Sequence, residues 1–320
     1  MPIITTEQIP KVLWKRRKRP SASHGTHTLH LPRFLVDAYG ELIDELGLRT
    51  AAEDISPNDE GPQGGMTEEE TNLHFARNFS GSCARIELVM LDPREMFKTT
   101  RDLFVKLFAG GRLHLLDIPC GAGAAGATLL CLAAELRNEG VLPRNPLRVT
   151  VVGGDISAPA RQIKRRLYRK LKPRLAEVGI SVTTSVHDWN VKNADQTSDL
   201  IERWIKGQKK TAKTAIFALN FSGFLSQRVD ECKLQLREFM RYGRTMGASV
   251  VWVEPCTNAA IQHLFPGLKQ HVFGANPRIA STWEDCPRQT ECRVAHPIQR
   301  RGRFTARAAA MHLEPVKEGA

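Results

Sequence analysis

One segment of the 320-residue chain limits the possible folds more than any other. Residues 113–126 read LHLLDIPCGAGAAG: an apolar run ends in Asp117, and three glycines follow before an Ala- and Leu-rich stretch. This order predicts a buried parallel strand, a tight turn and the start of a helix. Glycines let a backbone approach a ligand closely, and the first turn of a helix offers N–H groups without helical partners. We therefore predict that a nucleotide-like cofactor binds at Gly121, Gly123 and Gly126.

Two classes of cofactor fit this turn. Gly121-Ala-Gly123-Ala-Ala-Gly126 matches the G-x-G-x-x-G pattern of NAD- and FAD-binding domains. Asp117 argues against that reading, because a carboxylate would repel a pyrophosphate but could accept a hydrogen bond from an ammonium or an amide. The segment also begins more than one hundred residues into the chain, whereas dinucleotide-binding domains often start near the N-terminus. An NAD-binding or non-catalytic Rossmann-like protein remains an alternative.

The same segment resembles the first motif of the class I S-adenosylmethionine-dependent methyltransferases, in which a strand-end acid precedes a glycine-rich turn. Pro119 and Cys120 depart from the pattern, since the family commonly has glycine and another small residue there. Pro119 removes an N–H donor and stiffens the turn. The resemblance covers roughly residues 111–315. It implies that Asp117, Pro119, Gly121 and Gly123 hold the methionine end of S-adenosylmethionine.

Acids at the next two predicted strand ends extend the resemblance. One strand ends at Asp155 and is followed by Ile156, and the next ends at Asp188 and is followed by Trp189. The resemblance implies that Asp155 accepts hydrogen bonds from the ribose hydroxyls, with Ile156 beside it. It also implies that Asp188 and Trp189 hold the adenine. The strands are expected over residues 113–117, 147–155, 180–188, 214–219 and 248–254.

The fourth strand ends in Asn220-Phe221-Ser222-Gly223. Amino-methylating enzymes of nucleic acids, within the same family, carry Asp/Asn-Pro-Pro-Tyr/Phe here, and this chain keeps the amide and the aromatic but neither proline. We expect Asn220 and Phe221 to be the catalytic residues that orient the acceptor, with Asn220 also at the cofactor. Arg85 is a candidate for the methionine carboxylate, because arginine binds carboxylates with two parallel hydrogen bonds. A plain turn and a surface salt bridge are the simpler alternatives.

The predicted fold class is α/β, with a Rossmann-like, seven-stranded, mostly parallel sheet, a closing antiparallel β-hairpin and an N-terminal helical extension. We divide the chain into a basic flexible leader (1–21), a helical extension or lid (22–110) and a cofactor-binding methyltransferase domain (111–320). Helices are expected over residues 31–48, 67–79 and 94–108, with a flexible loop over 54–65. The hairpin, over residues 292–313, has a basic tip, Gln299-Arg-Arg-Gly-Arg303.

Positive charge points to the partner. The chain has 46 Lys and Arg against 34 Asp and Glu, a net charge of +12, concentrated over residues 11–19, 161–174, 206–213 and 300–307. Clustered cations suit phosphate binding, so we expect an RNA or DNA acceptor, although each cluster could instead be a solvated surface. A small-molecule or protein acceptor is the alternative. An aromatic content of 7% does not favour extended stacking on single strands.

The remaining features suggest a cytoplasmic protein. No apolar run approaches the roughly 20 residues that span a bilayer, and the first residues do not form a signal-peptide pattern. Seven cysteines, an odd number, fit reduced thiols. Cys286, Cys292 and His296 invite a zinc interpretation, but their spacing is not C-x-x-C, and we predict no metal.

Overall fold

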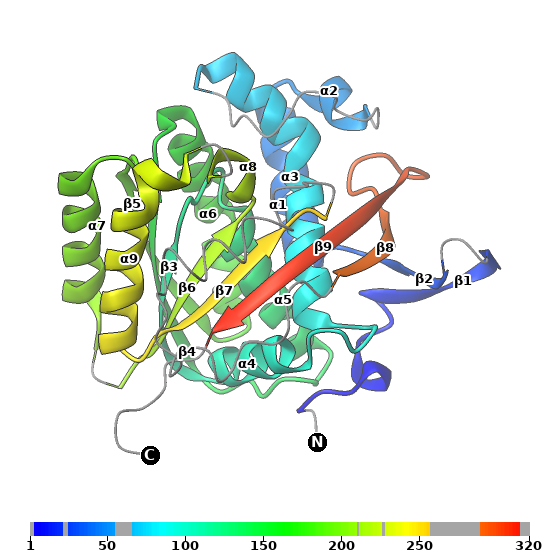
Figure 1. Cartoon of the computed structure of the whole chain (residues 1–320). Coiled ribbons are helices and arrows are strands. Elements are labelled where there is room, and N and C mark those ends of the chain that lie inside the picture. Colours follow the sequence, from blue (N-terminus) through cyan, green and yellow to red (C-terminus); the bar gives the residue numbers. More distant parts are fainter. Residues whose placement is uncertain are drawn as a thin grey trace.

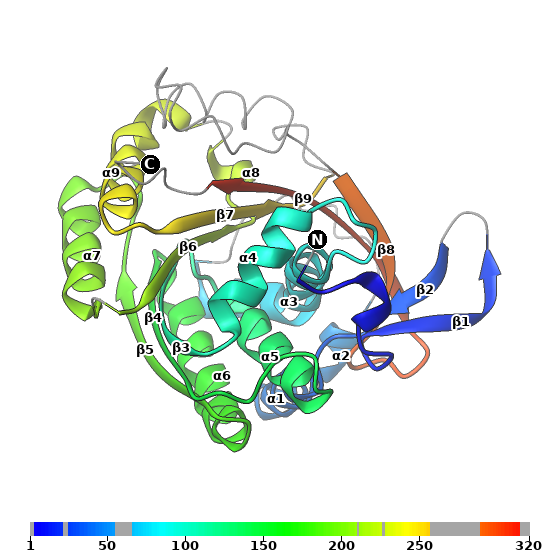
Figure 2. The same cartoon turned by 90° about the horizontal axis from the view of Figure 1, so that it is seen from below.

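A nine-stranded sheet runs through the molecule, with helices on both of its faces (Figures 1 and 2). The structure is a computed structural model that describes residues 3–21, 25–54, 66–209, 211–225, 228–256 and 289–313. One side of the sheet, from its edge at β5 to β7, is parallel and has the order β5-β4-β3-β6-β7. These strands are β3 (Gly111–Asp117), β4 (Leu147–Asp155), β5 (Ile180–Asp188), β6 (Lys213–Leu219) and β7 (Ser249–Glu254).

The sheet continues beyond β7 with antiparallel strands. Strand β9 (Arg303–Leu313) pairs antiparallel with β7, and β8 (Gln289–Ala295) pairs antiparallel with β9, which confirms the predicted hairpin. Two further strands follow at that edge: β2 (Gly25–Leu29), parallel to β8, and β1 (Trp14–Ser21), antiparallel to β2. The predicted count of seven strands is therefore wrong.

The first residues do not form the flexible leader that their charge suggested. Residues 1–21 contain the 3-10 helix η1 (Thr6–Gln8) and the whole of the edge strand β1, and β2 lies in the stretch expected to be helical. Lysine and arginine are common on exposed edge strands, where they stay solvated and discourage pairing with another chain. A run of basic residues therefore does not distinguish a leader from an edge strand.

Helices cover both faces of the parallel strands (Figure 2). Neighbouring residues of one strand accordingly enter different cores: Leu115 packs in one hydrophobic cluster and Leu116 in the other. Burial on both faces explains why β6 and β7 are almost entirely apolar, whereas the edge strand β5 is mostly polar and only partly buried. One face carries α1 (Arg33–Glu45), α3 (Glu68–Leu91), α4 (Lys98–Phe108), α5 (Ala124–Asn138) and α6 (Ala158–Glu177); the other carries α7 (Ala194–Gly207) and α9 (Val229–Thr245). The short helices are α2 (Arg49–Glu53) and α8 (Ser222–Leu225).

Helix α3 brings the N-terminal part of the chain to the carboxyl ends of the parallel strands. It begins at the predicted cap: Thr67 Oγ1 accepts a hydrogen bond from the Glu70 N–H, and the Glu70 side chain accepts one from the Thr67 N–H. The helix extends to Leu91, well past the expected end. In its first turn Thr71 Oγ1 lies 3.4 Å from Ser157 Oγ, just after β4. Among the described residues, no helix has the length and apolarity needed to cross a membrane.

Candidate functional site

The glycine turn between β3 and α5 has the predicted strand–turn–helix form. Gly121 has φ +46° and Gly123 φ +91°, left-handed values that favour glycine. A Cβ added to Gly121 would meet no atom within 4 Å, so the space beside this residue is open. A Cβ on Gly123 would instead lie 2.9 Å from Lys164 Cγ. Helix α5 begins at Ala124, so its N-terminus lies at the carboxyl edge of the sheet.

Asp117 does not face this edge as expected. Its Oδ2 accepts a hydrogen bond from Lys164 Nζ at 2.6 Å, and the two side chains are 1% and 0% exposed. Burial raises the pKa of the Asp117 carboxyl, and the ammonium of Lys164 offsets only part of that rise. Burial disfavours the Lys164 ammonium too, but Asp117, Cys120 and Tyr168 together outweigh it, and the pKa of Lys164 is raised. Asp117 is thus a structural anchor beneath the turn, whereas Pro119 is half-buried in the turn itself.

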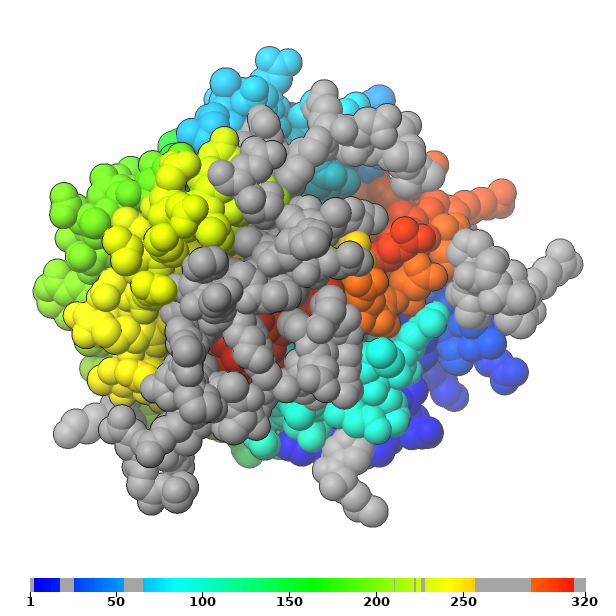
Figure 3. Space-filling view, in the orientation of Figure 1, coloured from blue at the N-terminus to red at the C-terminus, as the bar shows by residue number. Residues whose placement is uncertain are grey.

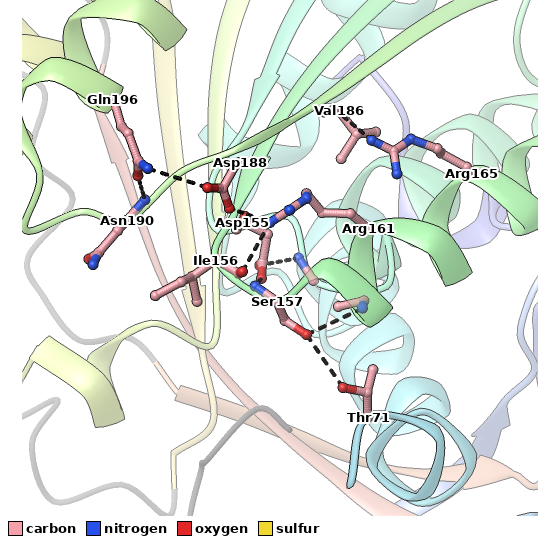
Figure 4. Close-up of polar contacts among 12 residues, drawn as sticks. Thr71, Asp155, Ile156, Ser157, Arg161, Arg165, Val186, Asp188, Asn190 and Gln196 are labelled. Atoms are coloured by element: carbon pink, nitrogen blue, oxygen red, sulfur yellow. Dashed lines mark hydrogen bonds and ion pairs between the residues drawn. The ribbon is translucent and has the colours of Figure 1, made fainter. Parts of the chain in front are cut away.

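Asp155 is tied to the glycine turn (Figure 4). Its Oδ2 accepts the N–H of Gly121 at 2.7 Å, and its Oδ1 accepts the N–H of Ser157 at 2.9 Å. Burial raises the pKa of Asp155, while these two N–H donors, Lys164 and Arg161 act in the opposite direction. A carboxylate has about four lone-pair sites, so about two remain for further donors.

Asp188 lies beside Asp155, since the two are paired across β4 and β5. Arg161 joins the strand ends: its Nη1 donates to the backbone oxygen of Asp155 (2.5 Å), to that of Ile156 (3.0 Å) and to Asp188 Oδ1 (2.6 Å). Gln196 Nε2 donates to the other oxygen of Asp188 at 3.3 Å. Between the two acids the Ile156 residue is 46% exposed, which makes an apolar patch at a polar edge (Figure 4).

Sequence reasoning missed the role of Arg161 and counted it only as one charge in a cluster. A signal was available, because a cation in the first turn of a helix opposes the helix dipole and needs a compensating partner. Here the partners are the carboxylate of Asp188 and two carbonyl oxygens.

Trp189 is buried in the hydrophobic core and is not exposed at the carboxyl edge of the sheet. It is 2% exposed, its Nε1 donates to Thr197 Oγ1 at 3.0 Å, and its ring packs edge-on against Phe239 with centroids 5.4 Å apart. The predicted contact with adenine does not agree with this burial. The aromatic after the strand belongs to the hydrophobic core under α7 and α9.

Asn220 and Arg85 come together at the end of β6. Asn220 has φ +54°; its Nδ2 donates to Ser82 Oγ at 2.7 Å and its Oδ1 accepts from Arg85 Nη1 at 3.5 Å. Both partners lie on α3, so the N-terminal region fixes the orientation of this amide. The guanidinium of Arg85 therefore contacts Asn220, and burial lowers the pKa of Arg85, with Glu254 acting in the opposite direction.

Phe221 is part of the core and not an exposed stacking surface. It is 6% exposed and stacks on Phe224 and Trp252, with centroid distances of 5.7 and 6.0 Å. Its N–H donates to Glu254 Oε1 at 2.7 Å, which links the ends of β6 and β7. The expected role of Phe221 in orienting an acceptor does not agree with this burial.

The possible zinc ligands are only partly visible. Cys286 lies outside the described residues, Cys292 is buried in β8, and His296 Nδ1 accepts the N–H groups of Ile298 and Gln299. Within the described ranges no three His, Cys, Asp or Glu side chains gather into a group that could hold a metal ion.

No protein-family model matches the chain, and neither does any curated protein. Among solved structures the chain is similar to a protein of Listeria monocytogenes that is provisionally assigned to the class I S-adenosylmethionine-dependent methyltransferases. The identity is 11% and the TM-score 0.32, over 90% of this chain and 87% of that one. A likeness this distant carries no argument about activity, so the function has to be inferred from the sheet order and the side chains described above.

Proposed function

We propose that this protein is an S-adenosylmethionine-dependent methyltransferase. The observation that carries the proposal is the sheet order: β5-β4-β3-β6-β7 is followed by the antiparallel strand β9 and then by β8. Dinucleotide-binding sheets continue the same five-strand order with a sixth strand and usually lack the antiparallel hairpin. In the methyltransferase class that the sequence resembles, the sheet closes with such a hairpin. The topology therefore favours a methyltransferase over an NAD-binding protein.

The residues at the carboxyl edge fit the proposed cofactor. The open space at Gly121 and the exposed Ile156 offer room and an apolar contact for a nucleoside. Asp155 would accept hydrogen bonds from the ribose hydroxyls with its remaining lone pairs. Asp188, whose side chain is 58% exposed, would accept from the exocyclic amine of adenine. When bound, S-adenosylmethionine supplies an electrophilic methyl group on a sulfonium.

Asn220 is the proposed residue for the acceptor. Methyl transfer requires mainly that the nucleophile be aligned, with a proton acceptor where one is needed. Ser82 and Arg85 hold the Asn220 amide from α3, so its orientation is fixed before any acceptor arrives. We propose Arg85 as a positioning residue acting through Asn220, in place of a ligand for the methionine carboxylate.

We propose a nucleic acid as the acceptor, supported by the net charge of +12. A small-molecule or protein acceptor is the second candidate. Transfer to a nucleic acid should weaken steeply as salt rises, because binding releases counterions from phosphates. Transfer to a small neutral acceptor should depend little on salt.

The test is incubation with methyl-labelled S-adenosylmethionine and separated pools of RNA, DNA, protein and metabolites. We expect label in a nucleic-acid pool and at least a tenfold loss in Asn220→Ala, about 1.4 kcal/mol or more in the barrier. The matched control is Asn145→Ala, an exposed residue just before β4 at the opposite edge of the sheet. Label in none of the four pools would contradict the proposal.

A further inference from the structure

A strongly basic recess lies where the first strands of the chain meet its last hairpin. We call it the basic groove; its volume is about 420 Å³. In Figure 1 it lies on the right, where β1 and β2 (blue) adjoin β8 (orange) and the start of β9 (red). Figure 3 shows the surfaces of these strands on the same side of the molecule. The groove is lined by Lys15, Arg16, Arg17, Thr28, His30, Arg293, Arg301 and Arg303.

Six of these eight side chains are cations and none is a carboxylate. They come from β1 and from the β8–β9 hairpin, so folding joins two of the basic clusters seen in the sequence. Five of the cations form no ion pair with any carboxylate in the described part of the chain: Lys15, Arg16, Arg293, Arg301 and Arg303.

The basic cluster over residues 161–174 differs in this respect. Arg166, Lys170 and Arg174 form ion pairs with Glu41 and Glu45 of α1. Two more of its cations, Arg161 and Lys164, pair with Asp188 and Asp117. Much of the charge of that cluster is therefore neutralised within the fold, whereas the five cations of the basic groove named above remain available to a ligand.

Like charges converge at the groove. Burial lowers the pKa of His30, and the nearby cations Arg303 and Lys15 lower it further. Cations held together in a recess without an anion repel one another and create a positive potential that attracts an anionic ligand.

The groove also lies at the edge of the sheet that carries the candidate site. Because β2 and β8 run in the same direction as β3 to β7, their carboxyl ends, with His30 and the hairpin tip, lie at that edge. Strand β8 is separated from β6 by β7 and β9. Three inter-strand steps amount to roughly 15 Å across the sheet, and the register places Arg293 and Arg303 beyond the level of Glu254 by a further roughly 13 to 20 Å along the strands, so the separation is roughly 20–25 Å. A polymer held in the groove can thus extend to Asn220.

We propose that the basic groove binds the phosphodiester backbone of the acceptor nucleic acid; the acceptor role rests on the function proposed above. A chain of phosphates can enter a recess and neutralise several separate cations at once, releasing their counterions. A flat anionic membrane would contact only the rim. A small polyphosphate would reach few of the six cations, which are spread over β1, β8, the hairpin turn and the start of β9.

The test compares two variants with the same loss of charge. In the groove variant Lys15, Arg301 and Arg303 are changed to Gln; in the control variant the exposed Arg148 and Arg169 and the part-exposed Lys172 are changed to Gln. Binding of a short fluorescent RNA and of duplex DNA is measured by anisotropy over a range of salt, after thermal unfolding has verified that all three proteins are folded. Phosphatidylserine vesicles and tripolyphosphate serve as competitors.

We expect the groove variant to bind RNA or DNA at least about tenfold more weakly at low salt. The slope of log K against log salt for RNA should fall in magnitude by about 2, at about 0.7 for each phosphate that the protein no longer neutralises. The control variant should change affinity less than about twofold. Equal weakening in both variants, displacement by vesicles, or displacement by tripolyphosphate at equal phosphate concentration would overturn the proposal.

Calorimetry with S-adenosylhomocysteine separates this proposal from the function on which it rests. If the wild type binds RNA through the groove and does not bind S-adenosylhomocysteine, the methyltransferase proposal fails while the groove remains a nucleic-acid site. If the wild type binds S-adenosylhomocysteine and the groove variant binds RNA normally, only the groove proposal fails.

Discussion

Replacement of Lys164 by Met should destabilise the protein strongly, because it leaves a carboxylate buried without its cation. Lys164 Nζ lies 2.6 Å from Asp117 Oδ2, and neither side chain is exposed by more than 1%. In contact, the pair is neutral overall whichever atom carries the proton. Without the lysine, Asp117 must either remain charged in a nonpolar environment or take up a proton.

Breaking a buried pair of this kind costs about 3–5 kcal/mol. For a chain of 320 residues that loss corresponds to a fall in Tm of roughly 4–8 °C. The double variant Asp117→Leu/Lys164→Met, which replaces both charged groups by apolar side chains, should recover most of the loss, since replacing both members of a buried pair by hydrophobic residues of similar volume is often close to neutral.

The loss of folding stability in Lys164→Met should also depend on pH. Burial raises the pKa of Asp117 and Lys164 opposes that rise, so without Lys164 the pKa lies higher than in the wild type, and the folded variant holds a proton that the unfolded state has already released. Stability is then lost as the pH rises above the pKa of the unfolded carboxyl, by up to about 1.4 kcal/mol per pH unit. The difference in Tm between the wild type and Lys164→Met should therefore be larger at pH 8 than at pH 5.

Thermal unfolding followed by circular dichroism measures these differences. Lys206→Met is the matched control, because Lys206 pairs with Glu202 on the exposed surface of α7, and it should change Tm little. A fall in Lys164→Met no larger than in this control, or a gap that does not change with pH, would refute the reasoning about the buried pair.

Two further stability predictions follow from buried polar groups. Burial, with a smaller contribution from Glu135, raises the pKa of Glu87 well above its ordinary value, and neither carboxylate oxygen has a hydrogen-bond partner among the described residues. Folding stability should therefore fall as the pH rises above about 4.5, and the Tm advantage of Glu87→Gln should grow between pH 5 and pH 8; an equal advantage at both would contradict this. Gly126→Ala should destabilise α5, because the new Cβ would lie 2.2 Å from Tyr168 Oη. In a Tyr168→Phe background the nearest remaining atom is 3.4 Å away, so the same change should become neutral or stabilising, as alanine is the better helix former. A lower Tm in both backgrounds would show that the hydroxyl is not the obstacle.

Much of the fold could be predicted from the sequence, because the parallel strands have clear signals. Apolar runs that end in an acid correspond to β3 and β4, a run rich in Val, Ile and Thr that ends in an acid corresponds to β5, and the capping pattern at Thr67 marks the start of α3. Strands β1 and β2 could not be predicted, since the basic residues of β1 have no alternating apolar face and β8, the partner that joins β2 to the sheet, is far away in the sequence.

The candidate site was predicted less completely. The sequence located the residues at the strand ends, but whether each side chain is buried depends on neighbours that only the folded chain brings to it. Lys164 forms a buried ion pair with Asp117, and residues of α7 and α9 pack on Trp189. Neither partner adjoins its residue in the sequence, so a pattern of strand-end residues could not separate Asp155 and Asp188 from residues that belong to the core.

The most direct test of the account is calorimetric titration of the wild-type protein and of Asp155→Ala with S-adenosylhomocysteine and with NADH. Asp199→Ala, an exposed acid on α7, is the matched control. The account predicts that the wild type and the control bind S-adenosylhomocysteine and not NADH, and that Asp155→Ala binds it at least tenfold more weakly, a loss of about 1.4 kcal/mol or more. Equal binding by Asp155→Ala, or binding of NADH in place of S-adenosylhomocysteine, would contradict it.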